Sequence, residues 1–153
     1  IQFVWAGDFA FKGISEGRKE IMEHMDDLPD NVHFLGLVER NQMNEFFNMA
    51  DVMLQLSFEE LFPMTILESM NANIPLLLRD LPEYKPILFD YYLKGSSQQT
   101  FKEQLTKLKE DPEYYAMACE GSKRGEQFYS KESILLQWQQ FYDKVATERN
   151  LKS

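Results

Sequence analysis

Residues 57–75 read Ser-Phe-Glu-Glu-Leu-Phe-Pro-Met-Thr-Ile-Leu-Glu-Ser-Met-Asn-Ala-Asn-Ile-Pro, and this stretch decides the fold. Directly before it, residues 51–56 form a short apolar run of the length expected for a buried strand. Pro63 can open a helix, because the backbone N–H at the first helical position has no intrahelical partner in any case. The stretch therefore predicts a strand, a loop carrying Glu60 and a helix carrying Glu68.

The start of this helix is suited to an anion. A helix N-terminus after a strand offers unpaired backbone N–H groups and a partial positive charge, which suit a phosphate or diphosphate. Glu68 lies one turn beyond Met64 and Thr65, so the three share a face near that end. A carboxylate there can accept hydrogen bonds from a ribose diol, and Glu60 in the loop can reach what lies beyond the phosphates. The pattern indicates a site for a nucleotide joined to a sugar.

Strand and helix patterns alternate along the whole chain, which favours a parallel sheet with helices on both faces. The predicted strands cover residues 2–6, 32–36, 51–56 and 75–79, with a weaker one near 91–93. The predicted helices cover residues 15–27, 41–49, 63–72, 98–109, 112–127 and 130–148, with Asp111 and Ser130 as caps of the last two. Ligands of such sheets bind at the carboxyl ends of the strands. Four segments fall there: residues 7–8, 36–38, 57–60 and 79–83.

Composition indicates an ordinary α/β domain. A chain of 153 residues with 44% hydrophobic residues can bury a core as one domain. The net charge of −9 argues against a nucleic-acid partner and against direct contact with anionic lipid. Cys119 is the single cysteine, which favours a reducing compartment, and we expect a cytoplasmic location. No run approaches the roughly 18 apolar residues of a spanning helix.

The 57–75 segment resembles the Glu-x7-Glu signature of retaining GT-B glycosyltransferases, especially glycosyltransferase family 4. The matching residues are Ser57, Glu60, Phe62, Glu68, Met70, Ala72 and Pro75. Residues 3–7, 31–36 and 49–52 are similar to other blocks of that family, so the resemblance covers about residues 1–88. Residues 76–81 and 93–95 look closest to bacterial galactosyl-glucosyl-diacylglycerol synthases, which add a sugar to glucosyl-diacylglycerol.

This resemblance implies the Rossmann-like, C-terminal half of a GT-B fold, which binds the sugar donor. It implies that Glu68 holds the ribose and that Glu60, the catalytic candidate, holds the donor sugar. The other implied donor-binding residues are Gly7, Gly36, Leu37 and Val38, the last two beside the nucleobase, and Phe62, Pro63, Met64 and Thr65 near the sugar and diphosphate. The implied reaction transfers a hexosyl group from a UDP-sugar with retained configuration, with no metal and no other cofactor.

The chain departs from the family pattern at three positions. Leu61 and Pro63 replace two glycines, and Asn73 replaces a small residue before the final proline. Proline has no N–H to offer a phosphate, so the contact must come from Met64, Thr65 or a neighbouring amide.

The family's Arg and Lys clamp for the diphosphate is not found before Ile1. We therefore expect residues 1–153 to be one N-terminally truncated donor-binding domain, inactive alone, whose clamp lies upstream. Lys12 and Arg18 are alternative cations, although surface charge explains them as well. The apolar stripe of the helix at 130–148 is expected to pack toward the missing N-terminal domain, and its exposed part to promote self-association. That domain is expected to dock the parent on the inner face of the plasma membrane.

Two other functions stay open: a nucleotide-sugar epimerase of the same fold and a non-catalytic Rossmann-like interaction module. Arg79, Asp80 and Glu83 fit either loop structure or donor contact. A metal site is not indicated, because the Asp-x-Asp signature is absent and His24 and His33 lie far apart. The glycine-rich dinucleotide motif and the Walker loop are absent too, which disfavours a dehydrogenase or an ATPase.

Overall fold

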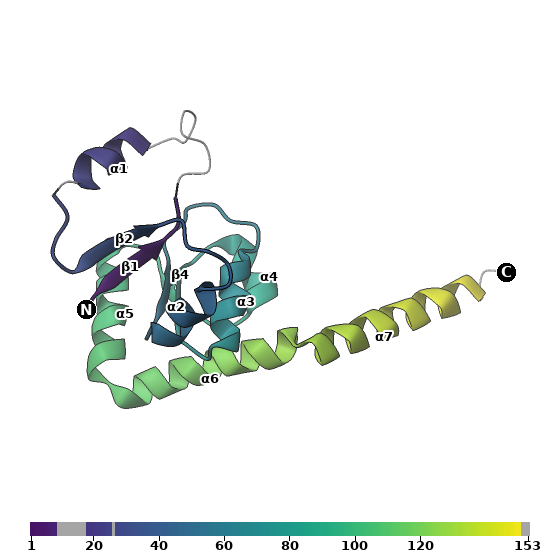
Figure 1. Ribbon diagram of the computed structural model, residues 1–153. Helices are drawn as coiled ribbons and strands as arrows, with labels where there is room; N and C mark the ends of the chain where they lie inside the picture. The colour runs from purple at the N-terminus through teal and green to yellow at the C-terminus, as the bar shows by residue number, and fades with distance from the viewer. Residues whose placement is uncertain (9–17, 26, 151–153) are drawn as a thin grey trace. The chain divides into compact units, whose positions relative to one another are not determined.

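The computed structural model describes residues 1–8, 18–25 and 27–150 (Figure 1). The chain divides into two compact units, Ile1–Phe46 and Phe47–Ser153. Helix α2 (Met43–Met49) contains the boundary between them. Each unit is described by itself.

The first unit is built on two parallel strands, β1 (Phe3–Ala6) and β2 (Val32–Gly36). The register pairs Phe3 with Val32 and shifts by one residue after Trp5. The Trp5 and Phe34 rings, which face each other across the pair, lie 4.7 Å apart. Helix α1 (Arg18–Met25) connects the strands, as a parallel pair requires a crossover.

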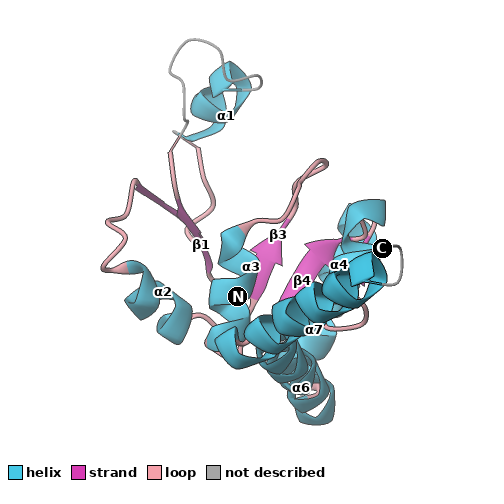
Figure 2. Cartoon of the chain, turned by 90° about the vertical axis from the view of Figure 1, so that its right-hand side faces the viewer, coloured by secondary structure: helices cyan, strands magenta, loops and turns pink. Residues whose placement is uncertain are grey.

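The second unit contains a parallel sheet of three strands in the order β3 (Met53–Gln55), β4 (Leu76–Arg79), β5 (Leu93–Gly95). Figure 2 shows β3 and β4 side by side in the sheet. Residues 76–78 of β4 are all buried, which is the pattern of a central parallel strand covered on both faces. The predicted α/β class with parallel strands is confirmed. In the described residues the strands form two sheets, of two and three strands.

Six helical segments complete the second unit. They are α3 (Met64–Asn71), the 3-10 helix η1 (Pro82–Tyr84), α4 (Lys85–Leu88), α5 (Gln98–Glu110), α6 (Pro112–Tyr129) and α7 (Lys131–Asn150). The predicted Asp111 cap is confirmed, since its carboxylate accepts hydrogen bonds from two first-turn amides, of Glu113 and Tyr114. The Ser130 hydroxyl likewise accepts from the Ser133 amide at 3.2 Å.

Two local features differ from the sequence prediction. The segment between β4 and β5 contains η1 and α4, which were not predicted, because elements this short have no hydrophobic periodicity. Strand β5 was predicted at residues 91–93 but begins at Leu93. Tyr92 is aromatic, a residue type common in strands, but it precedes the strand and packs in the core cluster.

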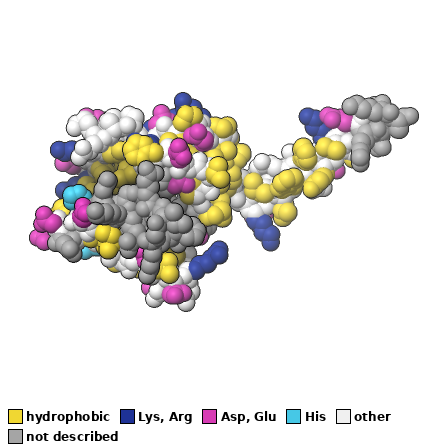
Figure 3. All heavy atoms as spheres, turned by 90° about the horizontal axis from the view of Figure 1, so that it is seen from above, with side chains coloured by type: hydrophobic (Ala, Val, Ile, Leu, Met, Phe, Trp, Pro, Cys, Tyr) yellow, Lys and Arg dark blue, Asp and Glu magenta, His cyan; other side chains and the backbone are white. Residues whose placement is uncertain are grey.

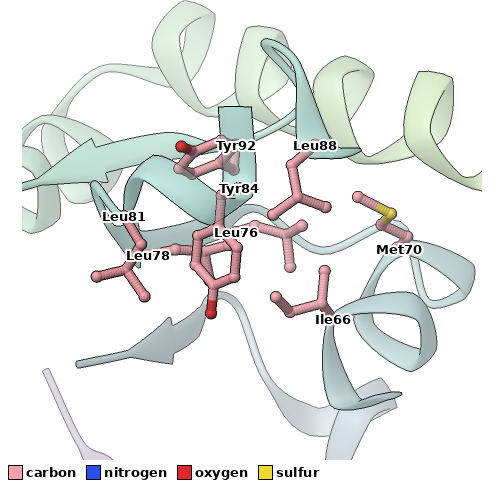
Figure 4. Packing of buried hydrophobic residues seen from close by; sticks show 8 residues of the cluster. All are labelled: Ile66, Met70, Leu76, Leu78, Leu81, Tyr84, Leu88 and Tyr92. Atoms are coloured by element: carbon pink, nitrogen blue, oxygen red, sulfur yellow. The ribbon is translucent and has the colours of Figure 1, made fainter. Parts of the chain in front are cut away.

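The core of the second unit lies between α3, β4 and the segment that follows β4. Figure 4 shows its eight buried members: Ile66, Met70, Leu76, Leu78, Leu81, Tyr84, Leu88 and Tyr92. Helix α6 packs on α3 through small residues, and at Gly125 an added Cβ would lie 2.7 Å from the Met70 side chain. The buried Ser122 hydroxyl donates to the Ile74 carbonyl at 2.6 Å, which fixes α6 against the chain entering β4.

Helix α7 continues beyond the end of α6 (Figure 1) and leaves its apolar side chains uncovered. Figure 3 shows hydrophobic side chains along this helix, in yellow. The exposed large apolar residues are Leu135, Leu136, Trp138, Phe141, Tyr142 and Val145. The rings of Trp138 and Tyr142 stack at 5.8 Å. None of the described helices is long and apolar enough to cross a membrane.

Candidate functional site

Glu60 is fixed to the carboxyl end of β3. Gln55, the last residue of that strand, donates from Nε2 to Glu60 Oε1 at 2.7 Å and to the Ser57 hydroxyl at 2.9 Å. The Glu60 side chain is half-buried, whereas the neighbouring Glu59 is exposed, as predicted for this pair. The structure therefore gives Glu60 a defined position in the loop between β3 and α3.

The same loop is held from the neighbouring strand. Arg79, the last residue of β4, donates from Nε to the Leu56 carbonyl at 2.9 Å. Its guanidinium carbon also lies 3.9 Å from the centre of the Phe58 ring, within the range of a cation–π interaction. Of the two roles weighed for Arg79, these contacts support the structural one. The side chain of Asp80 is also engaged, since it accepts from the Tyr92 hydroxyl at 3.4 Å and lies 3.8 Å from Lys94 Nζ.

The N-terminus of α3 follows this loop and has no side-chain cap. Pro63 was predicted as the first helical residue, but it is the N-cap, because its ψ of 129° is extended. The helix therefore begins at Met64. The Ile66 amide donates to the Pro63 carbonyl at 3.1 Å, which leaves the amides of Met64 and Thr65 as the first donors at this helix end. No acidic residue occupies the first turn, so its partial positive charge is not neutralised there.

Glu68 lies in the second turn of α3 and is half-buried. Its backbone carbonyl accepts from the Ala72 amide at 3.1 Å, and the helical spacing sets its side chain on the face of Met64 and Thr65, as predicted. Among the described residues, no hydrogen bond or ion pair to the Glu68 carboxylate is present. The carboxylate is therefore available to a ligand at this end of the helix.

The residues between the two carboxylates differ in orientation. The half-buried Phe62 ring packs against the core cluster and lies 5.6 Å from the Tyr129 ring. Leu61, which stands where the family pattern has glycine, is 91% exposed by residue, and Met64 is 63% exposed. Thr65 is half-buried and its carbonyl accepts from the Ser69 hydroxyl at 2.7 Å.

The remaining candidates belong to the first unit. The Gly7 amide donates to the Gly36 carbonyl at 2.8 Å, so the structure brings these two glycines together at the strand ends. Gly36 has a φ of 68°, a conformation that favours glycine. Leu37 is 82% exposed and Val38 is half-buried. Lys12 lies outside the described residues, and Arg18 is described only as the first residue of α1.

Sequence reasoning missed Tyr84. It is fully buried, and its hydroxyl oxygen has no hydrogen-bond partner in the described structure. Burial, followed by the negative charges of Glu60 and Glu83, raises the pKa of Tyr84 to about 12. Tyr84 stands between Glu83 and Lys85 in a proline-containing connection, a setting typical of an exposed loop, so the sequence carried no signal for a buried hydroxyl. No group of three or more metal-binding side chains occurs in the described parts of the chain.

A family model described as glycosyl transferases group 1 matches residues 2–124. The chain belongs to this family. It is 37% identical over 146 residues to an alpha-galactosylglucosyldiacylglycerol synthase of Streptococcus pneumoniae, covering 95% of this chain and 39% of that protein. It is also 28% identical over 110 residues to a processive diacylglycerol alpha-glucosyltransferase of Acholeplasma laidlawii, covering 71% of this chain and 32% of that protein. The chain thus spans well under half of these relatives.

Solved structures share the fold. HepE from Anabaena in complex with UDP-glucose matches with a TM-score of 0.72 at 16% identity, covering 95% of this chain and 41% of that one. Sucrose-phosphate synthase from Thermosynechococcus elongatus matches with a TM-score of 0.70 at 18% identity, covering 95% of this chain and 38% of that one. At these identities the likeness concerns the fold alone, and it agrees with the predicted half of a GT-B fold.

Proposed function

We propose that the chain is the donor-binding half of a retaining hexosyltransferase of glycosyltransferase family 4. The proposed donor is a UDP-sugar and the proposed acceptor is a diacylglycerol glycolipid. One observation carries the proposal: Glu60 is anchored to the end of β3, directly before an uncapped helix N-terminus that has Glu68 one turn inside. Membership of the group 1 family supports the reaction class.

The second unit offers groups for the diphosphate, the ribose and the sugar of a UDP-sugar. The amides of Met64 and Thr65, at the positive end of α3, suit the diphosphate and the charge that develops on it as the sugar leaves. Glu68 suits the ribose hydroxyls, and Glu60 suits the hydroxyls of the sugar. This stabilisation uses fixed dipoles, so the proposed reaction requires neither a metal nor another cofactor.

The acceptor and the location are inferred from the relatives. Both curated relatives are named as enzymes of diacylglycerol glycosylation, which supports a glycolipid acceptor. The chain has a net charge of −9, so it is a poor surface for anionic lipid. We therefore assign membrane docking and the acceptor site to another domain of a peripheral cytoplasmic protein.

The proposal is tested by incubating the full-length protein with UDP-glucose or UDP-galactose and a diacylglycerol glycolipid. The expected product is an elongated glycolipid whose new bond has the anomeric configuration of the donor, read by NMR. Glu68→Ala should weaken UDP-sugar binding about tenfold, because hydrogen bonds to a charged group are lost. Glu60→Gln should lower turnover. Glu59→Gln is the matched control, since it alters an exposed carboxylate one residue away.

Other outcomes identify the alternative functions. Free epimerised nucleotide sugar without glycolipid product would indicate an epimerase. Failure of the full-length protein to bind UDP or UDP-sugars in calorimetry would indicate an interaction module. The isolated chain is expected to show no turnover, and measurable transfer by it would overturn the two-domain interpretation.

A further inference from the structure

We propose that Tyr84 is a positioning residue for Glu60, with its hydroxyl donating a hydrogen bond to the Glu60 carboxylate when the sugar donor is bound. The inference rests on the proposed function and extends it to a residue outside the Glu-x7-Glu segment. It concerns only groups of the second unit.

Tyr84 carries a buried polar atom that no described residue satisfies. The residue is fully buried and its hydroxyl has no partner among the described residues. Buried polar groups in proteins are nearly always hydrogen-bonded, since an unpaired buried donor costs stability. Its ring packs edge-on against Tyr92 at 5.9 Å, and Figure 4 shows the two hydroxyl oxygens pointing away from each other. The ring is therefore fixed, while its polar atom points out of the core cluster without a partner.

Tyr84 follows the strand next to the one that holds Glu60. Tyr84 ends η1, which begins three residues after the carboxyl end of β4, and β4 pairs with β3 so that Leu78 faces Gln55. Gln55 in turn holds Glu60 at 2.7 Å. After burial itself, the negative charges of Glu60 and Glu83 both raise the pKa of Tyr84. Parallel neighbouring strands end at the same edge of the sheet, so the segment that carries Tyr84 and the loop that carries Glu60 both leave the sheet there.

The Glu60 carboxylate can take a further hydrogen-bond donor. Among the described residues, the Glu60 carboxylate accepts a side-chain hydrogen bond from the Gln55 amide, and an ionised carboxylate can accept several hydrogen bonds. A donated bond from Tyr84 would orient the second carboxylate oxygen toward the sugar hydroxyls. The hydroxyl would thereby gain the partner that it lacks, so the cost of burying it would be recovered only when the site is occupied.

The test compares Tyr84→Phe with Tyr115→Phe. Phenylalanine keeps the ring of Tyr84 and removes only the oxygen. Tyr115 is the matched control, because its hydroxyl donates to the Asp51 carbonyl at 3.1 Å, at the amino end of β3 and away from the site. In thermal unfolding of the chain, Tyr84→Phe should not lower the midpoint, because no bond is lost, whereas Tyr115→Phe should lower it.

The functional arm uses the full-length protein with UDP-glucose, UDP-galactose and UDP as probes. Tyr84→Phe should raise the Kd of the UDP-sugar that is used about tenfold and leave the Kd of UDP unchanged, because Glu60 faces the sugar. In the Glu60→Gln variant, adding Tyr84→Phe should raise the Kd of the UDP-sugar by a smaller factor than in the wild type. If the wild type binds no UDP-sugar, the proposed function itself fails.

If the wild type binds and Tyr84→Phe binds equally well, the positioning role is refuted. A loss of thermal stability in Tyr84→Phe as large as that in Tyr115→Phe would also overturn it, since the hydroxyl would then have a structural partner. Equal weakening of UDP and UDP-sugar would place the effect on the nucleotide instead of Glu60 and would contradict the inference as well.

Discussion

At position 73 the backbone adopts a conformation that few side chains tolerate. Asn73 has a φ of 55° directly after the C-terminal end of α3, and its amide donates to the Met70 carbonyl at 2.9 Å. Asparagine is the residue that most readily replaces glycine in this left-handed region. The departure from the family pattern at this position is therefore conservative in backbone terms.

We expect Asn73→Ala to lower the free energy of unfolding by about 1 kcal/mol, because alanine lacks the short polar side chain that lets asparagine adopt the left-handed region. Asn73→Gly should have an effect near zero or slightly favourable. Urea denaturation of both variants measures the difference. Equal stability of the two variants would show that the helix end relaxes without cost.

Two buried tyrosines set a limit on alkaline stability. Burial raises the pKa of Tyr84 and of Tyr92 to about 12, in each case with a contribution from a neighbouring carboxylate. Because the pKa is raised, each tyrosine stays protonated to a higher pH in the folded state than in the unfolded state, where it ionises near the ordinary value of 10. The stabilisation from these groups is therefore complete below pH 10.

We expect the free energy of unfolding to fall as the pH rises from 10 toward about 12. Urea midpoints measured in steps over this interval report the loss. The Tyr92→Phe variant keeps the ring and removes one titrating group, so its midpoint should decline less steeply than that of the wild type. An identical slope in both proteins would contradict the assignment to Tyr92.

At the scale of elements, the close contact between α6 and α3 depends on small side chains. Ala118, Gly121, Ser122 and Gly125 are the buried residues of α6, and an added Cβ at Gly121 would lie 3.2 Å from the Tyr91 carbonyl oxygen. The buried Ser122 hydroxyl also donates to the Ile74 carbonyl, in the turn before β4. This helix face is therefore selected for its small size and for one hydrogen bond.

Replacing Ser122 by alanine should cost about 1–3 kcal/mol, because the buried Ile74 carbonyl would lose its side-chain donor. Replacing the exposed Ser96 by alanine is the control and should change stability by less than about 0.5 kcal/mol. Chemical denaturation measures both. If the Ser122 variant is as stable as the control, a water molecule or another donor must satisfy the carbonyl.

The long elements were predictable from local pattern. Strand β2 has the predicted bounds, and α5 and α6 begin at the predicted residues, because Ser97 and Asp111 are strong caps. The order of loop, helix N-terminus and Glu68 could likewise be predicted, since it depends on neighbours in sequence. The bonds from Gln55 to Glu60 and from Arg79 to Leu56 depend on strand pairing and on rotamers, which no local pattern specifies. The burial of Tyr84 likewise depends on tertiary packing, which no local pattern specifies.

At the scale of the whole molecule, α7 is the feature that does not fit a closed domain. Its exposed aromatic side chains lie at helical spacing, and Trp138 and Phe141 line a shallow pocket on the helix. Exposed apolar surface of this kind marks an interaction site or promotes association. The prediction that it packs toward an N-terminal domain stays a prediction.

Alone in solution, the chain should therefore self-associate through α7. The molar mass from light scattering should rise with protein concentration, and more so in high salt, which screens the net charge of −9. Trp138→Glu with Phe141→Glu should abolish the rise. Gln139→Glu with Gln140→Glu adds the same charge on the same helix and should leave a similar rise. Monomeric wild type at high concentration would contradict the prediction.

The core cluster of the second unit has a consequence for how the chain folds. All eight of its members lie between Ile66 and Tyr92, so the core forms from one continuous stretch of chain. Bringing together residues that are close in sequence costs little loop-closure entropy and favours rapid folding. We expect α3, β4 and η1 to form the folding nucleus, on which β3 with its Glu60 loop, and then α6 and α7, assemble later. The loop that carries Glu60 would thus acquire its structure only after the core cluster has formed.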